Sequence, residues 1–419
     1  MIFFIYNLIV LIFLPVLLIR LFLKSFNDKD YLKNISNRLG FYKEKGFDQV
    51  VWFHAVSLGE VISSERLINN ITKEHNIVLT VSTPTGFRQA NKIFDEKVTV
   101  VYAPWDFYVF IKRFINHFKP IALVIFETEI WPSMISLSSS KGLPIILSNA
   151  RLSKESNDRY MRMNFFMKAI FQKITLVLAQ SSKHVDRFIK LGVENNNVKK
   201  VGSLKFDVKL SNTQNIERDN NTIIAVSTHP GEEEIICNVF KDLMEYESSL
   251  KCVLVPRHPE RSENVRKIFT ENKINSVIKE GIPDTFNANE VTIIKGIGFL
   301  NSLYRMASIA FIGGSLSKSY GGHNIIEASV NKCPFIVGPY MKNFEDIVDQ
   351  YVHHNGCVQL KDSTQLYDVF LKILNDDELK TNMVNNSLKV FEENQGSLEK
   401  QYNYINKLLN KNETSNCNN

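Results

Sequence analysis

The feature that most constrains the fold is a regular alternation of short apolar runs with longer amphipathic segments. The runs are rich in β-branched residues, which is typical of buried strands, and the segments between them have helical character. Such alternation predicts parallel sheets covered by helices on both faces, which is an α/β fold. We expect strands at residues 50–54, 77–81, 98–102, 121–126, 145–148, 176–179, 222–226, 252–255, 291–294, 309–313 and 335–337.

The length of the chain and one polar stretch divide this pattern in two. A chain of 419 residues exceeds the size of one ordinary hydrophobic core. Residues 211–221 (SNTQNIERDNN) are polar and interrupt the alternation. We therefore predict two doubly wound, Rossmann-like domains facing a cleft, with ligands beyond the carboxyl ends of the strands. The predicted boundaries are a first domain at 24–210, a linker at 211–221, a second domain with C-terminal helices at 222–409, and a polar tail at 410–419.

Charge and cysteine content exclude several function classes. The net charge of +6 is mild and the sequence has no dense run of Lys and Arg, so nucleic-acid binding is not expected. The five cysteines lack CxxC spacing, which argues against a disulfide framework and against a zinc site. A reducing cytoplasm fits this pattern best.

The first 23 residues are apolar apart from Asn7 and Arg20. At 1.5 Å per residue they are long enough to cross a bilayer. They lack the basic start and the small-residue cleavage site of a signal peptide, so we expect an uncleaved anchor. Basic residues follow the segment, which places the rest of the chain in the cytoplasm. The alternative is a monotopic helix that lies in the membrane interface, kinked at Pro15.

Residues 311–327 (FIGGSLSKSYGGHNIIE) are expected to form a strand, a glycine-bearing loop and the start of a helix. Backbone N–H groups at a helix start favour a bound anion such as phosphate. Gly313, Gly314 and Gly322 permit close backbone approach, while Asn324 and Glu327 would lie near the helix start. An ordinary strand-to-helix connection is the alternative.

The first domain carries four charged candidates, of which Glu60, Glu129 and Arg151 follow predicted strands and Lys205 lies at the hinge that ends the domain. Glu60 falls in the first turn of a helix, where it either acts in catalysis or favours the helix dipole. Glu129 lies in a loop with two carboxylates, where desolvation and mutual repulsion raise a pKa toward that of a general base, although capping the next helix is the alternative. Arg151 and Lys205 suit an anionic substrate, and surface roles are the alternative for both.

In the second domain, Arg257 follows a strand and suits recognition of a phosphate or a planar base. His258 by itself is better explained as a structural histidine, and the acidic residues 232–234 as partners of the helix dipole. The loops contain no HxxxH or DxD pair. No divalent metal is therefore expected.

Seven motifs in this order resemble the 3-deoxy-D-manno-octulosonic acid (Kdo) transferases of lipopolysaccharide synthesis. They are FHAVSLGE, FETEIWP, SNARLS, GSLKFD, STHPGEEE, VPRHPER and GGS…GGHNIIEAS. The resemblance extends from the N-terminal segment to about residue 345, with only apolar exchanges such as Ile326. It implies a GT-B glycosyltransferase that is inverting, uses no metal or other cofactor, and transfers Kdo from CMP-Kdo to a lipid A precursor (lipid IVA) at the cytoplasmic leaflet of a bacterial inner membrane.

The resemblance also implies roles for individual residues. Glu60 matches the family's catalytic base, and Glu129 and Lys205 match residues that support the transition state. The donor's CMP moiety would be held by Pro256, Arg257, Ile297, Gly298, Phe299, Asn324, Ile325, Ile326 and Glu327. Further anion contacts are expected from Arg151, Gly313, Gly314, Gly322 and His323.

Two rival functions remain at this point. One is an enzyme of similar fold that uses a UDP-sugar, such as an N-acetylglucosaminyl transferase or an epimerase. The other is a membrane-anchored scaffold with a degenerate nucleotide site, against which the presence of Glu60, Lys205 and Glu327 argues.

Overall fold

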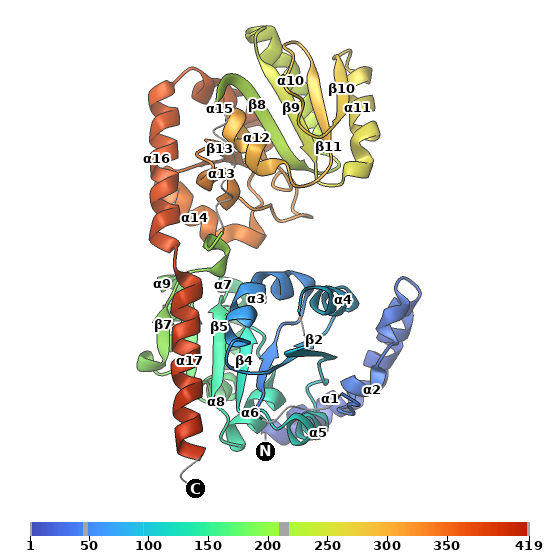
Figure 1. The fold of residues 1–419 in the computed structure, drawn as a ribbon, viewed down its shortest axis with the longest axis vertical. Helices are drawn as coiled ribbons and strands as arrows, with labels where there is room; N and C mark the ends of the chain where they lie inside the picture. The colour runs from blue at the N-terminus through green and yellow to red at the C-terminus, as the bar shows by residue number, and fades with distance from the viewer. Residues whose placement is uncertain (1, 45–48, 95, 209–217, 417–419) are drawn as a thin grey trace. The chain divides into compact units, whose positions relative to one another are not determined.

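The computed structural model describes residues 2–44, 49–94, 96–208 and 218–416. They form two compact α/β units. Unit 1 comprises Met1–Asp207 together with Gly396–Asn419, and unit 2 comprises Val208–Gln395 (Figure 1). Each unit contains one parallel sheet of seven strands, so the predicted fold class of two parallel-sheet α/β domains is confirmed.

The sheet of unit 1 has the strand order β3-β2-β1-β4-β5-β6-β7. The order reverses direction between β1 and β4, which makes their carboxyl ends the expected ligand site. The strands are β1 (Val51–His54), β2 (Ile77–Val81), β3 (Val98–Tyr102), β4 (Ala122–Phe126), β5 (Ile145–Ala150), β6 (Leu176–Ala179) and β7 (Val198–Lys200). The helices are α1 (Ile2–Ser25), α2 (Ile35–Arg38), α3 (Leu58–Ile71), α4 (Pro84–Ile93), α5 (Tyr108–Phe118), α6 (Pro132–Ser140), α7 (Lys154–Arg162), α8 (Asn164–Phe171), α9 (Ser182–Lys190) and α17 (Ser397–Asn416).

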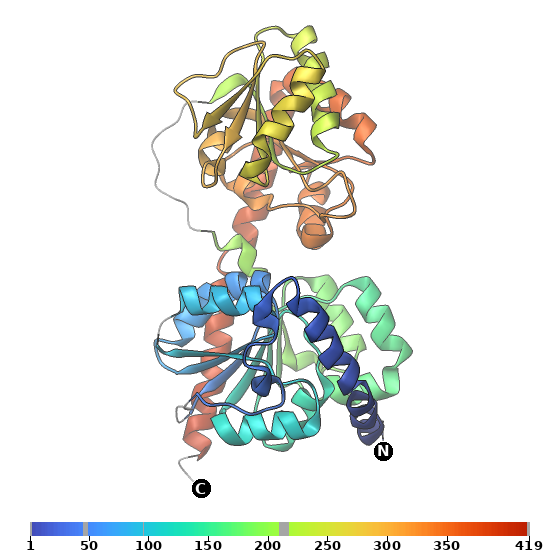
Figure 2. The same ribbon diagram turned by 90° about the vertical axis from the view of Figure 1, so that its right-hand side faces the viewer.

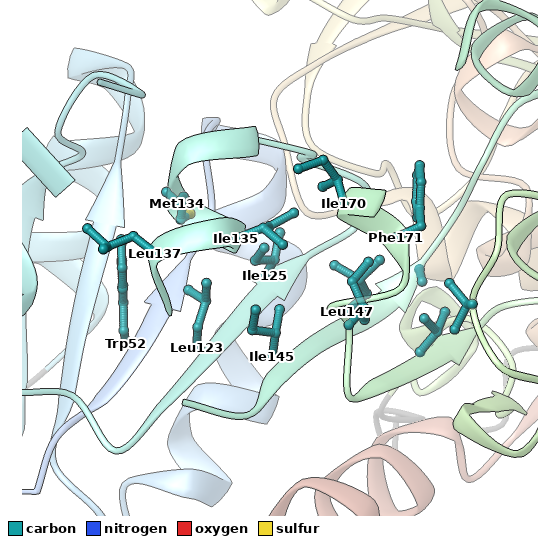
Figure 3. Close-up of a cluster of buried hydrophobic side chains, with 14 of the residues drawn as sticks. Trp52, Leu123, Ile125, Met134, Ile135, Leu137, Ile145, Leu147, Ile170 and Phe171 are labelled. Atoms are coloured by element: carbon teal, nitrogen blue, oxygen red, sulfur yellow. The ribbon is translucent and has the colours of Figure 1, made fainter. Parts of the chain in front are cut away.

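Helices cover both faces of this sheet because the strands are apolar on both sides. On one face, side chains of α5, α6, α8 and α9 pack against the strands in a cluster that includes Trp52, Ile125 and Phe171 (Figure 3). On the other face, α3, α4 and α17 bury a second cluster. The sheet is therefore the rigid support for the loops at its carboxyl edge.

The sheet of unit 2 has the order β10-β11-β9-β8-β12-β13-β14. Its direction reverses between β8 and β12, which again marks a ligand site at the carboxyl edge. The strands are β8 (Asp219–Thr228), β9 (Lys251–Pro256), β10 (Ser276–Glu280), β11 (Val291–Lys295), β12 (Ala307–Ile312), β13 (Phe335–Val337) and β14 (Val358–Gln359). The helices are α10 (Glu233–Tyr246), α11 (Ser262–Glu271), α12 (Leu300–Met306), α13 (Ile326–Val330), α14 (Glu345–His353), α15 (Leu366–Leu374) and α16 (Asp377–Asn394).

The C-terminal segment differs from the sequence-based boundaries. Residues 396–409 were expected in the second domain, but α17 belongs to unit 1, where it lies against β5 and α3 (Figure 1). The reason is apolar burial, since Ile405 and Leu409 are at most 1% exposed in the core of the first sheet. The predicted tail is also wrong in part, because α17 continues to Asn416, while residues 417–419 lie outside the described residues.

The predicted linker is shorter on its C-terminal side than expected. Residues 211–217 lie outside the described residues, and β8 already begins at Asp219. The side chain of Asp219 pairs with Lys251 Nζ at 2.7 Å and accepts a hydrogen bond from Thr222 Oγ1 at 2.9 Å. These bonds fix the polar start of an otherwise apolar strand.

One side of helix α1 packs against the rest of unit 1 (Figure 2). Asn7 and Leu21 are buried, and residues 3, 10, 14 and 17, which share their face, are half-buried. Tyr6 Oη donates to Asp106 Oδ2 at 2.7 Å, and Asn7 Oδ1 accepts from the N–H of Tyr108 at 2.8 Å. Most of the remaining side chains of α1 are apolar and exposed, and the helix is long and apolar enough to cross a membrane.

Candidate functional site

The carboxyl ends of β1, β4 and β5 are neighbours in the sheet of unit 1 and carry most of the charged candidates. Glu60 follows β1, Glu127 and Glu129 follow β4, and Arg151 follows β5. Three loops that are distant in sequence thus meet at the edge where the strand order reverses.

Glu60 is fixed by a capping interaction at the start of α3. Ser57 is the N-cap residue, and its Oγ accepts from the N–H of Glu60 at 3.4 Å. In return, the Glu60 carboxylate accepts from Ser57 Oγ and from the N–H of Val56, both at 2.8 Å. This reciprocal bonding holds the carboxylate at one defined position and leaves it few rotamers.

The surroundings of Glu60 make it a base near neutral pH. Burial raises the pKa of Glu60 to about 7, although the hydrogen bonds from Val56 and Ser57 act in the opposite direction. The charges of Glu129 and Glu127 raise this pKa further. A carboxylate with such a pKa is suited to accept a proton from a substrate hydroxyl.

The loop after β4 presents two carboxylates through an unusual backbone conformation. Glu127 has a φ of 57°, which is rare for a residue with a side chain. Glu129 Oε2 accepts from Trp131 Nε1 at 3.0 Å, and burial raises the pKa of Glu129. Thr128 Oγ1 both donates to the carbonyl of Arg151 and accepts from its N–H, which joins this loop to the loop after β5. The helix α6 begins only at Pro132, and Glu129 makes no side-chain cap to it.

Lys205 lies in a short 3-10 helix, η3 (Leu204–Phe206), and completes the cluster. Burial lowers the pKa of Lys205, the charge of Glu127 raises it, and the charge of Arg151 lowers it. The structure therefore brings Glu60, Glu129, Lys205 and Arg151 into one electrostatic cluster. Glu127 connects its acidic and basic members, and the sequence-based site did not include it as a separate residue.

A buried polar network positions the Lys205 segment, and sequence reasoning missed it. Gln401 Oε1, from α17, accepts from Ser148 Oγ at 2.7 Å and from the N–H of Asn149 at 2.8 Å. Asn149 has a φ of 51°, and its Oδ1 accepts from the N–H of Leu204 at 3.1 Å. The carboxylate of Asp207 accepts from the N–H groups of Gly396 and Leu398 at the start of α17. The C-terminal helix thus fixes the turn that carries Lys205.

Unit 2 gathers its candidates at the carboxyl ends of β11, β9, β8 and β12, which are adjacent in the sheet. Arg257 is exposed directly after β9, where its N–H donates to the carbonyl of Thr228 at 3.0 Å. Ile297 is 79% exposed after β11, although it is apolar. Pro256 is the last residue of β9, and Gly298 and Phe299 follow Ile297 in the loop after β11.

The glycine-bearing loop after β12 binds a carboxylate of the protein itself. Glu232, which is 1% exposed, accepts from the N–H groups of Gly314, Ser315 and Leu316 at 2.7 to 2.9 Å. The N–H of Gly313 donates to Val226 O at 2.8 Å, and that of Gly322 to Gly314 O at 2.7 Å. The amides of Gly313, Gly314 and Gly322 are therefore occupied in this structure, contrary to the expectation that they are free to bind an anion.

Glycine is nevertheless required in this loop for steric reasons. A Cβ on Gly313 would lie 2.7 Å from Ser227 O, and a Cβ on Gly314 would lie 2.7 Å from the ring of His323. Gly314 also has a φ of 67°. The loop is shaped to hold the buried Glu232, so the acidic residue does more than favour the helix dipole of α10.

Two histidines of unit 2 pack against each other beside this loop. His229 Nε2 lies 2.8 Å from His323 Nε2, and the His229 ring stacks on Tyr320 with centroids 3.8 Å apart. Burial lowers the pKa of each histidine to about 4, and the charge of Arg257 acts in the same direction. His229 and Tyr320 were not among the predicted site residues, although His229 lies inside one of the seven motifs.

Asn324 and Glu327 lie together near the start of α13, as expected. Asn324 Nδ2 donates to Glu327 Oε1 at 3.0 Å, and Asn324 Oδ1 accepts from the N–H of Ile326 at 3.1 Å. Burial raises the pKa of Glu327, while the charge of Arg257 lowers it. Ile325 and Ile326 have fully buried side chains, so only their backbone atoms are available to a ligand.

The loop with Arg257 is anchored by a buried ion pair. Arg261 donates to both oxygens of Glu233, at 2.8 and 3.1 Å, and Glu233 has no exposed surface. A bidentate pair of this kind fixes the orientation of the guanidinium group. In the part of the chain that the structure describes, no group of three or more His, Cys, Asp or Glu residues has the arrangement of a metal site.

Comparison with known proteins agrees with these features. The family model for 3-deoxy-D-manno-octulosonic-acid transferase matches residues 33–208. The chain is 30% identical over 425 residues to a 3-deoxy-D-manno-octulosonic acid transferase of Haemophilus influenzae, covering 98% of this chain and 99% of that protein. It is 28% identical to the transferase of the same description from Rickettsia bellii, covering 94% and 97%.

Two solved structures resemble this chain in fold. A UDP-GlcNAc 2-epimerase from Neisseria meningitidis aligns with a TM-score of 0.55 and 13% identity, covering 84% of this chain and all of that one. The MnaA protein of S. aureus, solved with UDP, aligns with the same TM-score and identity, covering 86% and 97%. The two-unit architecture is thus of the GT-B type. Because its relatives span nearly its whole length and its charged loops coincide with the motifs quoted above, this chain belongs to the family of 3-deoxy-D-manno-octulosonic acid transferases, which are glycosyltransferases of lipopolysaccharide synthesis.

Proposed function

We propose that the protein transfers Kdo from CMP-Kdo to a lipid A precursor, lipid IVA, with inversion at the anomeric carbon and without a metal ion. The observation that carries this proposal is Glu60, a carboxylate with a pKa of about 7 that is fixed at the carboxyl edge of the first sheet. The reaction needs a base at such a position, because a sugar hydroxyl becomes a strong nucleophile only as it loses its proton.

In the proposed step, the acceptor hydroxyl attacks the anomeric carbon of Kdo from the face opposite to CMP. The new C–O bond forms as the bond to the CMP oxygen breaks, and the hydroxyl proton passes to Glu60. A single displacement of this kind inverts the anomeric centre and needs no enzyme nucleophile. Glu129 and Lys205 support the charge that develops in the transition state, because both lie in the same cluster as Glu60.

The departing CMP carries a phosphate monoester whose negative charge grows as the bond breaks. In unit 2, Arg257 is an exposed cation directly after β9, and its charge acts on His229, His323 and Glu327. A guanidinium group can bind a phosphate through two parallel hydrogen bonds. We assign Arg257 to the CMP phosphate, which provides the charge that a metal ion supplies in other transferases.

Helix α1 is proposed to bind the cytoplasmic leaflet of the inner membrane while lying in its plane. Tyr6 and Asn7 attach the start of α1 to unit 1, and just beyond its end Asp28 and Asp30 both bond to Arg88 of α4. A helix held to one domain at both ends cannot place these ends on opposite sides of a bilayer while the domain stays in water. This supports the monotopic alternative over a spanning anchor.

The test is transfer by the purified full-length protein, with CMP-Kdo and lipid IVA as substrates and mass spectrometry of the lipid product. We expect a mass increase of one or more Kdo units with the wild-type protein and none with Glu60→Gln. Glu65→Gln, on the same helix α3, is the matched control and should keep wild-type activity. Equal activity of the Glu60 and Glu65 variants would remove Glu60 from the mechanism.

Nucleotide binding distinguishes the proposed function from that of a UDP-sugar enzyme of the same fold. CMP should raise the melting temperature of the protein, and UDP should not, because a ligand stabilises only the state that binds it. The reverse result would favour the UDP-sugar function.

A further inference from the structure

We propose that unit 2 contains a second anion site, for a phosphate-bearing ligand, at the amino ends of its strands. A cavity of about 800 Å³ lies there, between the starts of β8, β12 and β13 and the helix α16. The donor residues follow the carboxyl ends of the strands, so this cavity is separate from them. Its described lining includes Arg218, Arg305, Ser308, Asn331, Lys332 and Lys380.

The described wall of the cavity is strongly cationic. It contains two arginines and two lysines but one carboxylate, that of Asp377. Asp377 pairs with Lys380 at 2.7 Å, yet its own side chain is 93% exposed, whereas that of Lys380 is 14% exposed. The acidic side chain therefore lies largely in solvent, and cationic side chains outnumber acidic ones four to one in the described lining.

Arg218 is oriented by neutral groups. Arg218 donates to the carbonyl of Asn331 at 3.1 Å and to the carbonyl of Lys332. Arg305 Nε donates to Asn331 Oδ1 at 2.8 Å. Asn331 is 6% exposed and also donates to Asn301 Oδ1 and to the carbonyl of Glu327, so it is a rigid support. The two carbonyls orient the Arg218 guanidinium group without cancelling its charge, which leaves this charge available to an anion.

A buried hydroxyl in the same wall is an independent indication of a ligand. Ser308 is 1% exposed and lines the cavity, and its Oγ has no hydrogen-bond partner among the described residues. Nearly all buried polar groups in folded proteins have a partner, so this hydroxyl is explained if a ligand oxygen accepts from it. Thr381 and Asn385, on α16, add further polar groups to the lining.

This combination fits a phosphate better than a carboxylate or a neutral sugar. A phosphate offers several oxygens with a charge between −1 and −2, which suits several cationic donors together with a hydroxyl. The volume of the cavity leaves room for a larger group attached to the phosphate. Two sources share this chemistry, namely a soluble phosphate compound and the headgroup of an anionic lipid.

The experiment uses the full-length protein in detergent with two probes, inorganic pyrophosphate and a soluble short-chain phosphatidic acid, and measures binding by calorimetry. All proteins carry Arg257→Ala, so that binding at the proposed donor site is weakened and is the same in every protein compared. The cavity variant is Lys332→Gln with Lys380→Gln. The matched control removes two exposed lysines of the same unit, Lys241→Gln with Lys267→Gln.

We expect the dissociation constant of the better probe to rise about tenfold or more in the cavity variant, because charged hydrogen bonds are lost, and to stay unchanged in the control. Ser308→Ala, which keeps the charge and the packing, should weaken the same probe about threefold to tenfold. Tighter binding of pyrophosphate indicates a soluble phosphate as the ligand, and tighter binding of the lipid indicates a headgroup. Equal affinities of the cavity variants and the control, for both probes, would overturn the proposal. If the lysine variant does not fold, as judged by its melting curve, Ser308→Ala decides.

Discussion

The raised pKa of Glu60 leads to a linked prediction for activity and stability. In the proposed mechanism, transfer needs the deprotonated carboxylate, and the pKa of about 7 means that about a tenth of the molecules hold it at pH 6. Below pH 7 the value of kcat/KM should therefore fall about tenfold for each pH unit, and above pH 8 it should be level. This slope should vanish together with the activity in Glu60→Gln.

The same rise in pKa means that the charged form of Glu60 destabilises the folded state. The pKa rises from 4.5 in the unfolded chain to about 7 in the fold. Since the folded pKa is the higher one, the protonated group is favoured on folding, and the stability that it contributes at low pH is lost as the pH rises through 7. This pKa difference lowers the free energy of unfolding above pH 8 by about 3 kcal/mol.

Glu60→Gln removes this cost but also removes one of two acceptor oxygens. The carboxylate accepts from Val56 N and from Ser57 Oγ with different oxygens, and Gln offers one, so about 1 kcal/mol is lost. The net gain in stability should be about 2 kcal/mol at pH 8, which raises the melting temperature of unit 1 by about 4–8 °C. At pH 5 the gain should be absent.

The measurement is a pair of thermal unfolding curves at pH 5 and pH 8, for the wild type, Glu60→Gln and the control Glu65→Gln. A variant that is inactive and more stable at pH 8 alone agrees with a base held at a raised pKa. If Glu60→Gln lowers the melting temperature equally at both pH values, Glu60 acts as a structural cap, and the argument from its pKa fails.

Three further predictions concern other parts of the chain. Gln401→Leu should lower kcat about tenfold or more while leaving CMP affinity unchanged, because Asn149 loses its partner and the turn with Lys205 moves; an unchanged kcat in a folded variant would show that α17 has no part in positioning. Arg257→Ala should weaken CMP binding in calorimetry about tenfold or more, since a charged contact is lost, and equal affinity would remove Arg257 from the site. Deletion of residues 1–23 should release the protein from membranes into the supernatant after centrifugation, and complete pelleting of the shortened protein would show that other surfaces bind the membrane.

The fold was largely predictable because buried strands leave a local signal. All eleven expected strands are present, and the three missed ones, β7, β10 and β14, are at the edges of their sheets. Edge strands bury less of their surface and need fewer apolar residues, so periodicity identifies them poorly. β10, for example, has no fully buried residue and ends in Lys279 and Glu280.

The site was predictable where a loop follows a strand, since the topology of a doubly wound sheet brings such loops together. Glu60, Glu129 and Arg151 were found in this way. Lys205 was instead placed at the end of the first domain, because the strand before it was not predicted, and the structure joins all four residues in one cluster. It was not predictable which acceptor the backbone amides of the glycine-bearing loop would bind. The same glycines that permit anion binding also permit the approach of Glu232, and the sequence pattern is identical for both outcomes.

Long-range packing explains why the sequence did not predict the position of α17 or the contacts of Gln401. Gln401 is separated from Asn149 by 252 positions, and no local pattern indicates that a glutamine on an amphipathic helix turns toward a sheet. Its burial in unit 1 follows from the apolar face of α17, where Ile405 and Leu409 enter the core and carry Gln401 into contact with the loop after β5. A helix that was assigned by sequence order to the second domain thus supports the loop after β5 in the first. This arrangement predicts that loss of the α17 contacts affects Lys205 before it affects the donor residues of unit 2.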